Sequence, residues 1–98
     1  MVGDRDRQTE TFAAWFRKLR DCRARARIQV RIDRLSLGDR GDFKPVGEGV
    51  SELRIDYGPG YRVYFVQPGD KLIVLLAGGD KRTQAEDIAM ALRLARLL

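Results

Sequence analysis

Histidine is absent from the 98 residues of this chain, and cysteine occurs once, at Cys22. The first absence removes the side chain that most often acts as a general base and as a zinc ligand, and we expect neither a metal nor a cofactor. One cysteine cannot form an internal disulfide, which favours a reducing compartment, and without a histidine Cys22 is expected to be a buried or inert thiol. No apolar run approaches the roughly 18 residues of a membrane span and no signal peptide is evident, so the sequence predicts a soluble cytoplasmic protein without membrane contact.

Positive charge is in excess. The chain has 19 Lys and Arg against 14 Asp and Glu, a formal net charge of +5, and a pI of about 9.9. Such a balance predicts an acidic partner, which is nucleic acid, an anionic surface or an acidic protein. With 44% hydrophobic residues the composition is globular, and the length predicts a single domain over residues 1–98.

Residues 50–77 contain three runs rich in Val, Ile, Leu, Tyr and Phe, separated by turn residues at 58–60 and 67–70. Apolar and polar residues alternate in the first two runs, and the third, 72–77, is almost continuously apolar. This pattern predicts an antiparallel three-stranded meander whose third strand is covered on both faces. The polar residues 1–8 are expected to form a frayed terminus or a short edge strand.

Two helices are predicted before this meander. The first is capped by Thr9 or Thr11 and has one apolar face at i, i+3, i+4 and i+7, made of Phe12, Trp15, Phe16 and Leu19. The second covers 23–37, where Ala and Arg favour helix, although the alternation over 24–32 also fits a strand. The two helices form a helical hairpin, and a glycine-rich loop over 38–49 follows it.

A last helix is predicted over 84–98, with Thr83 and Glu86 as a capping box at its start. Its apolar residues form two stripes, so we expect it to be buried or covered by a partner. The preceding Gly-Gly-Asp-Lys-Arg-Thr at 78–83 lacks the spacing of a phosphate-binding loop and is interpreted as a tight turn. The predicted fold is α+β: a small antiparallel sheet packed on an N-terminal helical hairpin, with a C-terminal helix.

Two sets of basic residues are candidates for nucleic-acid binding. In the first, between positions 17 and 34, four arginines fall on one helical arc and are spaced to follow a phosphate backbone: Arg20, Arg27, Arg31 and Arg34. A solvated face that keeps a small basic protein soluble explains the same residues equally well.

The second set lies in the meander and just after it: Arg54, Arg62, Lys81 and Arg82, with Tyr57, Tyr61 and Tyr64 beside them. If the turn at 58–60 pairs the two strands, Arg54 and Arg62 point to the same side. Converging guanidiniums bind phosphate and stabilise the charge of a pentacovalent phosphorane, and tyrosines stack on bases. The alternative, which the residues alone favour, is that both arginines pair with Glu52 and Asp56 while the tyrosines pack in the core.

Three motifs in this order of elements resemble the RelE/ParE superfamily of toxin–antitoxin toxins: Glu52-Leu53-Arg54, Tyr61-Arg62-Val63-Tyr64 and Gly79-Asp80-Lys81. The resemblance covers residues 9–92 and is strongest to the addiction-module killer proteins, a subgroup near HigB. It implies a small antiparallel sheet on a helical hairpin and a first strand near residues 2–8.

The function that this resemblance implies is that of a toxin neutralised by a cognate antitoxin in a hetero-oligomeric complex. RelE-like members cleave mRNA on the ribosome without a metal, by attack of the 2′-hydroxyl on the adjacent phosphate. ParE-like members inhibit DNA gyrase by binding it, and a basic protein-binding domain without activity is a third interpretation. Carried over by position, the basic catalytic residues are Arg54, Arg62 and Lys81 or Arg82. The predicted RNA contacts are Arg20, Arg27, Arg31, Arg34, Tyr61 and Tyr64.

Many relatives also have a tyrosine or histidine near the C-terminus that takes part in proton transfer. This chain has neither after residue 64. The residues that we expect to substitute for it are Tyr57, Tyr61, Tyr64, Glu52 or Asp80. The helix over 84–98 and the helical hairpin are expected to offer apolar surface to an acidic or amphipathic antitoxin segment.

Overall fold

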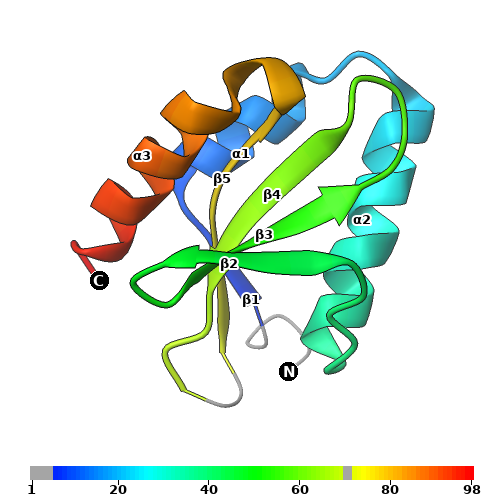
Figure 1. The fold of residues 1–98 in the computed structure, drawn as a ribbon. Helices are drawn as coiled ribbons and strands as arrows, with labels where there is room; N and C mark the ends of the chain where they lie inside the picture. Colours follow the sequence, from blue (N-terminus) through cyan, green and yellow to red (C-terminus); the bar gives the residue numbers. More distant parts are fainter. Residues whose placement is uncertain (1–5, 70–71) are drawn as a thin grey trace.

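The computed structural model describes residues 6–69 and 72–98, and this part of the chain has an α+β fold built on one five-stranded sheet (Figure 1). The strands lie in the order β1-β5-β4-β3-β2. The elements are β1 (Asp6–Gln8), α1 (Glu10–Lys18), α2 (Cys22–Ser36), β2 (Phe43–Gly47), β3 (Val50–Ile55), β4 (Tyr61–Val66), β5 (Ile73–Asp80), the 3₁₀ turn η2 (Lys81–Thr83) and α3 (Gln84–Ala95). The predicted α+β class is confirmed.

The three strands β3, β4 and β5 form the predicted antiparallel meander, and the β3–β4 register pairs Arg54 with Arg62. The short strand β1 pairs with β5 in parallel, so the sheet is mixed and the prediction of an entirely antiparallel sheet was wrong. An edge strand near the N-terminus is confirmed at Asp6–Gln8. The rest of the expected strand over 2–8, and Asp70 of the second predicted turn, lie outside the described residues.

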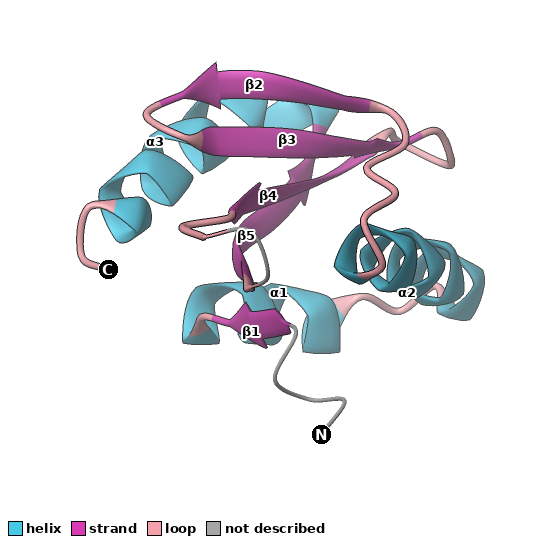
Figure 2. Cartoon of the chain, turned by 90° about the horizontal axis from the view of Figure 1, so that it is seen from below, coloured by secondary structure: helices cyan, strands magenta, loops and turns pink. Residues whose placement is uncertain are grey.

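The segment 38–49, predicted to be a loop, contains the edge strand β2, which pairs antiparallel with β3. Pro45 has no backbone N–H to donate, and it is tolerated because β2 is an edge strand whose register shifts directly after it. Glu48 and Gly49 make the turn into β3 with φ values of 52° and 82°, a left-handed conformation typical of tight hairpin turns. Gly47 and Gly49 therefore belong to the β-hairpin of β2 and β3 (Figure 2), whereas Gly38 and Gly41 lie in the segment before β2.

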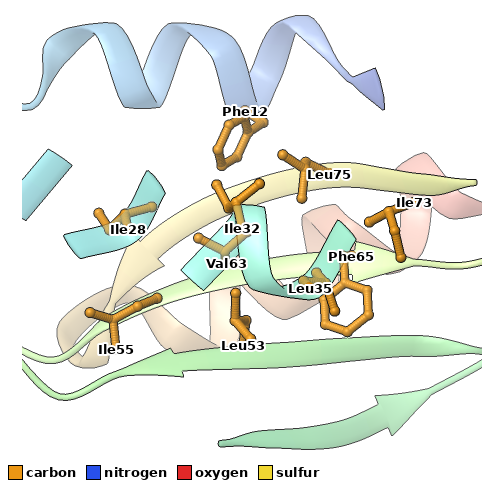
Figure 3. Close-up of a cluster of buried hydrophobic side chains, with 10 residues drawn as sticks. All are labelled: Phe12, Ile28, Ile32, Leu35, Leu53, Ile55, Val63, Phe65, Ile73 and Leu75. Atoms are coloured by element: carbon orange, nitrogen blue, oxygen red, sulfur yellow. The ribbon is translucent and has the colours of Figure 1, made fainter. Parts of the chain in front are cut away.

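One face of the sheet is covered by α1 and α2, so the two predicted N-terminal helices are confirmed. Thr9 caps α1 by accepting from the N–H of Phe12, and Asp21 caps α2 by accepting from the N–H groups of Arg23 and Ala24. The strand alternative for the second segment was wrong. Ten buried side chains join these helices to the strands (Figure 3): Phe12, Ile28, Ile32, Leu35, Leu53, Ile55, Val63, Phe65, Ile73 and Leu75.

The opposite face of the sheet is covered by α3, and Figure 2 shows α2 and α3 on opposite sides of it. The buried residues of this second cluster are Val50, Tyr64, Val74, Leu76, Ala77 and Ala91. The helix ends at Ala95, short of the predicted 84–98, and leaves Leu97 and Leu98 exposed. In the described ranges, 6–69 and 72–98, no helix has both the length and the apolar character needed to cross a membrane.

The strand β5 continues through Gly78 and Gly79 to Asp80, so the tight turn predicted to begin at residue 78 was placed too early. Both glycines permit a close approach of another side chain. A Cβ on Gly78 would collide with the indole of Trp15, and a Cβ on Gly79 would collide with the carboxylate of Asp87 from α3. The two glycines thus let α1 and α3 approach the end of β5.

The predicted capping box was also wrong. The Thr83 side chain accepts no capping hydrogen bond from a backbone N–H of α3; its hydroxyl donates instead to Oδ2 of Asp87 at 2.6 Å. The cap of this region is Asp80, which accepts from the N–H of Arg82 at 2.8 Å and begins the turn η2. The 3₁₀ turn moves the capping position from Thr83 to the last residue of β5.

Candidate functional site

Two neighbouring strands place Arg54 and Arg62 side by side on the face of the sheet that α3 covers. The register pairs these residues directly, so the prediction that they point to the same side is confirmed. Glu52 lies beside them and is 1% exposed. Its Oε1 lies 3.8 Å from Nε of Arg54 and 3.7 Å from Nε of Arg62. The alternative of structural pairing is therefore confirmed for Glu52, whereas no ion pair of Asp56 occurs among the described residues.

The other carboxylate oxygen of Glu52 has two donors. Its Oε2 accepts from the hydroxyl of Tyr64 at 3.0 Å and from Nε2 of Gln84, the first residue of α3, at 2.6 Å. Burial, and then the adjacent Glu52 charge, raise the pKa of Tyr64 far above its usual value. Because the ring is completely buried, Tyr64 cannot stack on a base, and its predicted role in RNA binding was wrong. Its proton is equally unavailable for transfer.

The guanidinium of Arg62 is nearly enclosed, because the residue is 5% exposed. Its Nη1 donates to the carbonyl of Tyr61 at 3.1 Å, but its buried Nε–H has no hydrogen-bond acceptor in the described structure. The Arg54 side chain is 41% exposed. Two guanidiniums beside one carboxylate leave one uncompensated positive charge, so the cluster is able to attract an anion such as phosphate.

The two basic residues that follow β5 are engaged differently. Arg82 is paired with Asp80, with Nη2 at 2.9 Å from Oδ2, and this hydrogen bond holds the pKa of Asp80 below its usual value. Asp80 is for that reason a weak base. The alkyl chain of Lys81 lies against Gly60 in the β3–β4 turn, where a Cβ would be 2.8 Å from Cε of Lys81. Lys81 has no ion pair within residues 6–69 and 72–98. Its charge therefore remains uncompensated, whereas the charge of Arg82 is paired with Asp80.

The arginines of α2 lie on the other side of the sheet. Arg27, Arg31 and Arg34 line a hollow of about 650 Å³ between α2 and the end of β3, together with Arg23, Ala26, Val30, Ile55 and Asp56. The prediction that Arg20 shares their helical arc was wrong, because Arg20 lies in the link between α1 and α2, before α2 begins at Cys22. Arg31 donates from Nη1 to the carbonyl of Arg54 at 2.6 Å, so it also ties α2 to the sheet.

Tyr57 and Tyr61 belong to this second side as well. The guanidinium of Arg27 lies 4.7 Å from the centre of the Tyr57 ring, and the rings of Trp15 and Tyr61 meet edge to face at 6.3 Å. Tyr61 is next to Arg62 in β4, and successive side chains of a strand point to opposite faces. The predicted site residues thus divide into two groups that the sheet separates, with Arg54 and Arg62 on one face and Tyr61 and the α2 arginines on the other.

Two residues near the arginine pair were not predicted. Gln84 contacts Glu52, and Asp87 lies against Gly79, the register partner of Arg62. Burial raises the pKa of Asp87, and the hydrogen bond from Thr83 offsets part of that effect. Gln84 does follow the Gly-Gly-Asp-Lys-Arg-Thr stretch directly, but nothing in the sequence shows that its amide turns back to β3.

Asp87→Asn is expected to stabilise the protein at neutral pH. A carboxyl whose pKa is raised by folding destabilises the native state when it is ionised, and this cost disappears as the pH falls through the raised pKa toward the unfolded value. In urea titrations the stability gain of the variant should be largest near about pH 7 and should vanish near about pH 3. Asp56→Asn, at an exposed position of the hollow beside α2, should show no such gain. A variant that is less stable than the wild type at neutral pH would contradict the assignment.

Within the described residues, no three His, Cys, Asp or Glu side chains come together as a group that could hold a metal ion. Cys22 is exposed at the start of α2, so of the two expected alternatives, a buried or an inert thiol, the buried one was wrong. The Nη2 of Arg25 donates to its Sγ at 3.7 Å.

Comparison with known proteins identifies two similarities. Residues 14–96 match a family model described as "Phage derived protein Gp49-like (DUF891)". The chain is also similar to an uncharacterized protein of Haemophilus influenzae, with 51% identity over 90 residues, which are 92% of this chain and 91% of that protein. The matched segment includes β3, β4, β5 and α3, which together carry the arginine pair, Glu52 and Gln84.

Proposed function

Because this chain belongs to the Gp49-like family of phage-derived proteins, a family associated with RelE-like toxins of toxin–antitoxin systems, we propose that it is a ribosome-dependent mRNA endoribonuclease of the HigB-like subgroup. The observation that supports this proposal is the pair Arg54 and Arg62, which share a single carboxylate and keep one uncompensated positive charge. The cognate antitoxin holds the enzyme inactive, and neither a metal nor a cofactor takes part.

The proposed reaction is a transesterification at one phosphodiester of the mRNA. The 2′-oxygen forms a bond to phosphorus and loses its proton to a base, and the bond from phosphorus to the 5′-oxygen breaks as that oxygen receives a proton. The products are a 2′,3′-cyclic phosphate and a 5′-hydroxyl. Arg54 and Arg62 bind the phosphate oxygens and stabilise the negative charge that develops on them. Such stabilisation by preorganised donors is usually the largest single contribution to the rate of such a step.

The proton acceptor is expected on the face of the sheet that carries the two arginines. Tyr57 and Tyr61 lie on the opposite side, and so does Asp80, the register partner of Tyr61. Of the residues predicted to substitute for a C-terminal tyrosine or histidine, Glu52 and Tyr64 lie on that face. Tyr64 is completely buried and donates its hydroxyl proton to Oε2 of Glu52, whereas Oε1 of Glu52 accepts no hydrogen bond within the described chain. We therefore assign proton abstraction to Glu52.

The proposed activity is tested by inducing the protein in cells and mapping abundant transcripts by primer extension. Discrete cuts within translated frames are expected, together with growth arrest, and both should disappear on co-expression of the antitoxin. Growth arrest with intact transcripts would overturn the proposal.

A gyrase-binding function like that of the ParE toxins is the second candidate. It is favoured by one observation: the last tyrosine of the chain, Tyr64, is buried and bound to Glu52, so no tyrosine or histidine beyond it is present to transfer a proton. This function predicts a DNA-damage response on induction while mRNA stays intact. The same primer-extension experiment, combined with a reporter of DNA damage, distinguishes the two functions.

The hollow beside α2 is proposed to bind the RNA backbone outside the cleavage site. Arg34→Ala should weaken binding of single-stranded RNA about equally for all sequences and reduce the dependence of log K on log salt by about 0.7, the loss of one phosphate contact. Arg93→Ala, at an exposed position of α3, removes the same charge elsewhere and should not change affinity. Fluorescence anisotropy between about 50 and 200 mM salt measures both variants. An equal effect of the two substitutions would show only a general charge effect.

A further inference from the structure

The carboxylate of Glu52 is held asymmetrically. Both hydrogen bonds that it accepts are made by Oε2, one from the Tyr64 hydroxyl at 3.0 Å and one from the Gln84 amide at 2.6 Å. The other oxygen, Oε1, faces Nε of Arg54 and Nε of Arg62 at 3.8 Å and 3.7 Å. These distances are too long for hydrogen bonds, so the two guanidiniums are attracted to Glu52 without being bound by it.

This asymmetry has a chemical consequence. Arginine and carboxylate normally form a two-pronged pair in which both oxygens accept. Here the second oxygen of Glu52 is occupied, so neither arginine can form that pair. The buried Nε–H of Arg62 is left without an acceptor as a result. The geometry thus keeps two guanidiniums together, with neither of them bound to Glu52 by a two-pronged pair.

We propose that Gln84 is a positioning residue of the phosphate site: its amide fixes Glu52 so that Glu52 holds Arg54 and Arg62 side by side without neutralising either one by a two-pronged bond. The inference rests on the proposed function, in which these arginines bind an RNA phosphate. It assigns a role to α3, because Gln84 is the first residue of that helix. Docking of the start of α3 on the sheet completes the site.

The amide is required for a specific reason. Gln84 can donate to Glu52 without adding charge, whereas an ionised side chain at the same position would repel the carboxylate. In Gln84→Glu the two carboxylates would lie within hydrogen-bond distance, and like charges this close cannot both be ionised without cost. When the introduced carboxyl is protonated, it donates to Oε2 as the amide does. When it is ionised, it displaces Glu52 toward the arginines and adds a negative charge to the site.

The variant therefore converts a positioning contact into a pH-dependent one. The titratable and charged groups around position 84 are Glu52 and Arg54 of β3, Arg62 and Tyr64 of β4, Asp80 at the end of β5, Lys81 and Arg82 of η2, and Glu86 and Asp87 of α3. All of them are present in the wild type too. A pH dependence that the variant shows and the wild type lacks belongs to the introduced carboxyl.

The test uses a fluorescein-labelled single-stranded RNA made resistant to cleavage by 2′-O-methyl groups, with anisotropy recorded from about pH 5 to about pH 8 at constant ionic strength. Gln84→Glu should bind about 10-fold more weakly than the wild type at the upper pH, which is the loss of one charge-assisted hydrogen bond, and should recover at the lower pH. Ala85→Glu places the same charge on the exposed neighbouring residue and should follow the wild type at both pH values. Equal binding by Gln84→Glu and the wild type throughout, or a loss that does not recover at low pH, would overturn the inference.

A second readout does not depend on RNA binding. The ¹⁵N–¹H signal of the Arg62 Nε–H should shift with pH in Gln84→Glu and stay constant in the wild type and in Ala85→Glu. If the wild type does not bind the RNA but this signal titrates as expected, the proposed function fails and the positioning role of Gln84 stands. A signal that is the same in all three proteins contradicts the positioning role, whatever the RNA experiment shows.

Discussion

Arg62→Ala is expected to abolish growth arrest and to reduce RNA cleavage by about 10²–10³-fold, the usual cost of removing one preorganised donor from a charged transition state. Arg62 contributes the enclosed half of the arginine pair, and its free Nε–H lies in a site from which bulk water is largely excluded. An electrostatic contact is strongest in such an environment. Primer extension on transcripts and the cleavage rate of a purified mRNA measure the loss.

A matched control is required because Arg62 also has a structural role. Its removal leaves the buried Glu52 with the partly exposed Arg54 as its remaining positive neighbour, so Arg62→Ala alone lowers stability. Arg62→Lys is the matched variant, because it keeps a positive charge beside the buried Glu52 and leaves the proposed base in place, while it removes the planar guanidinium that binds phosphate. Arg93→Ala tests for the general loss of a surface charge. Full toxicity of a folded Arg62→Ala protein would remove Arg62 from the site.

Glu52→Ala is expected to have the largest effect on stability, a decrease of about 3–5 kcal/mol in the free energy of unfolding, as is typical when one partner of a buried ion pair is removed. The variant leaves Arg62 as a buried charge beside Arg54 and deprives Tyr64 and Gln84 of their shared acceptor. Urea or guanidinium titration at neutral pH measures the change.

Tyr64→Phe provides the comparison for this measurement. It removes one hydrogen bond to Glu52 and leaves both charges paired, so a smaller decrease of about 0.5–1.5 kcal/mol is expected. If Glu52→Ala were no more destabilising than Tyr64→Phe, the carboxylate would not be holding the arginine pair in solution.

The position of the arginine pair could be predicted from the sequence because strand geometry is strict. The Gly-Pro-Gly turn at 58–60 separates two alternating runs, and alternation fixes which side chains share a face. Arg54 and Arg62 are both offset by an even number of positions from Glu52 or Tyr64, so all four point to the α3 side. The helices were predicted equally well, since the apolar periodicity of α1 and α2 reports the face that each one buries.

The contacts of the site could not be predicted because they depend on how α3 docks. The hydrogen bond from Gln84 to Glu52 spans 32 residues of sequence, and it forms because the 3₁₀ turn after Asp80 sets the start of the helix. Thr83 looked like a cap in the sequence and has a different partner in the structure. Local patterns identify a helix but do not determine which of its polar residues turns toward the sheet.

Errors in the fold prediction have equally local causes. The strand β2 contains Pro45 and ends in Gly47, both of which are typical of loops, and its pairing to β3 is visible only once β3 is in place. The strand β1 is three residues long and polar, and it is held by backbone pairing to β5, which leaves no apolar alternation in the sequence. Such edge strands are determined by their neighbour more than by their own residues.

The proposed endoribonuclease activity is tested most directly by incubating the purified protein with a defined mRNA on purified ribosomes and mapping the ends of the fragments. The proposal predicts cuts at ribosome-occupied codons that leave a 5′-hydroxyl on the downstream fragment, with no cuts in the naked mRNA and none with Arg62→Ala. Intact mRNA in the presence of protein that arrests growth in cells would contradict it and leave gyrase binding as the function to test.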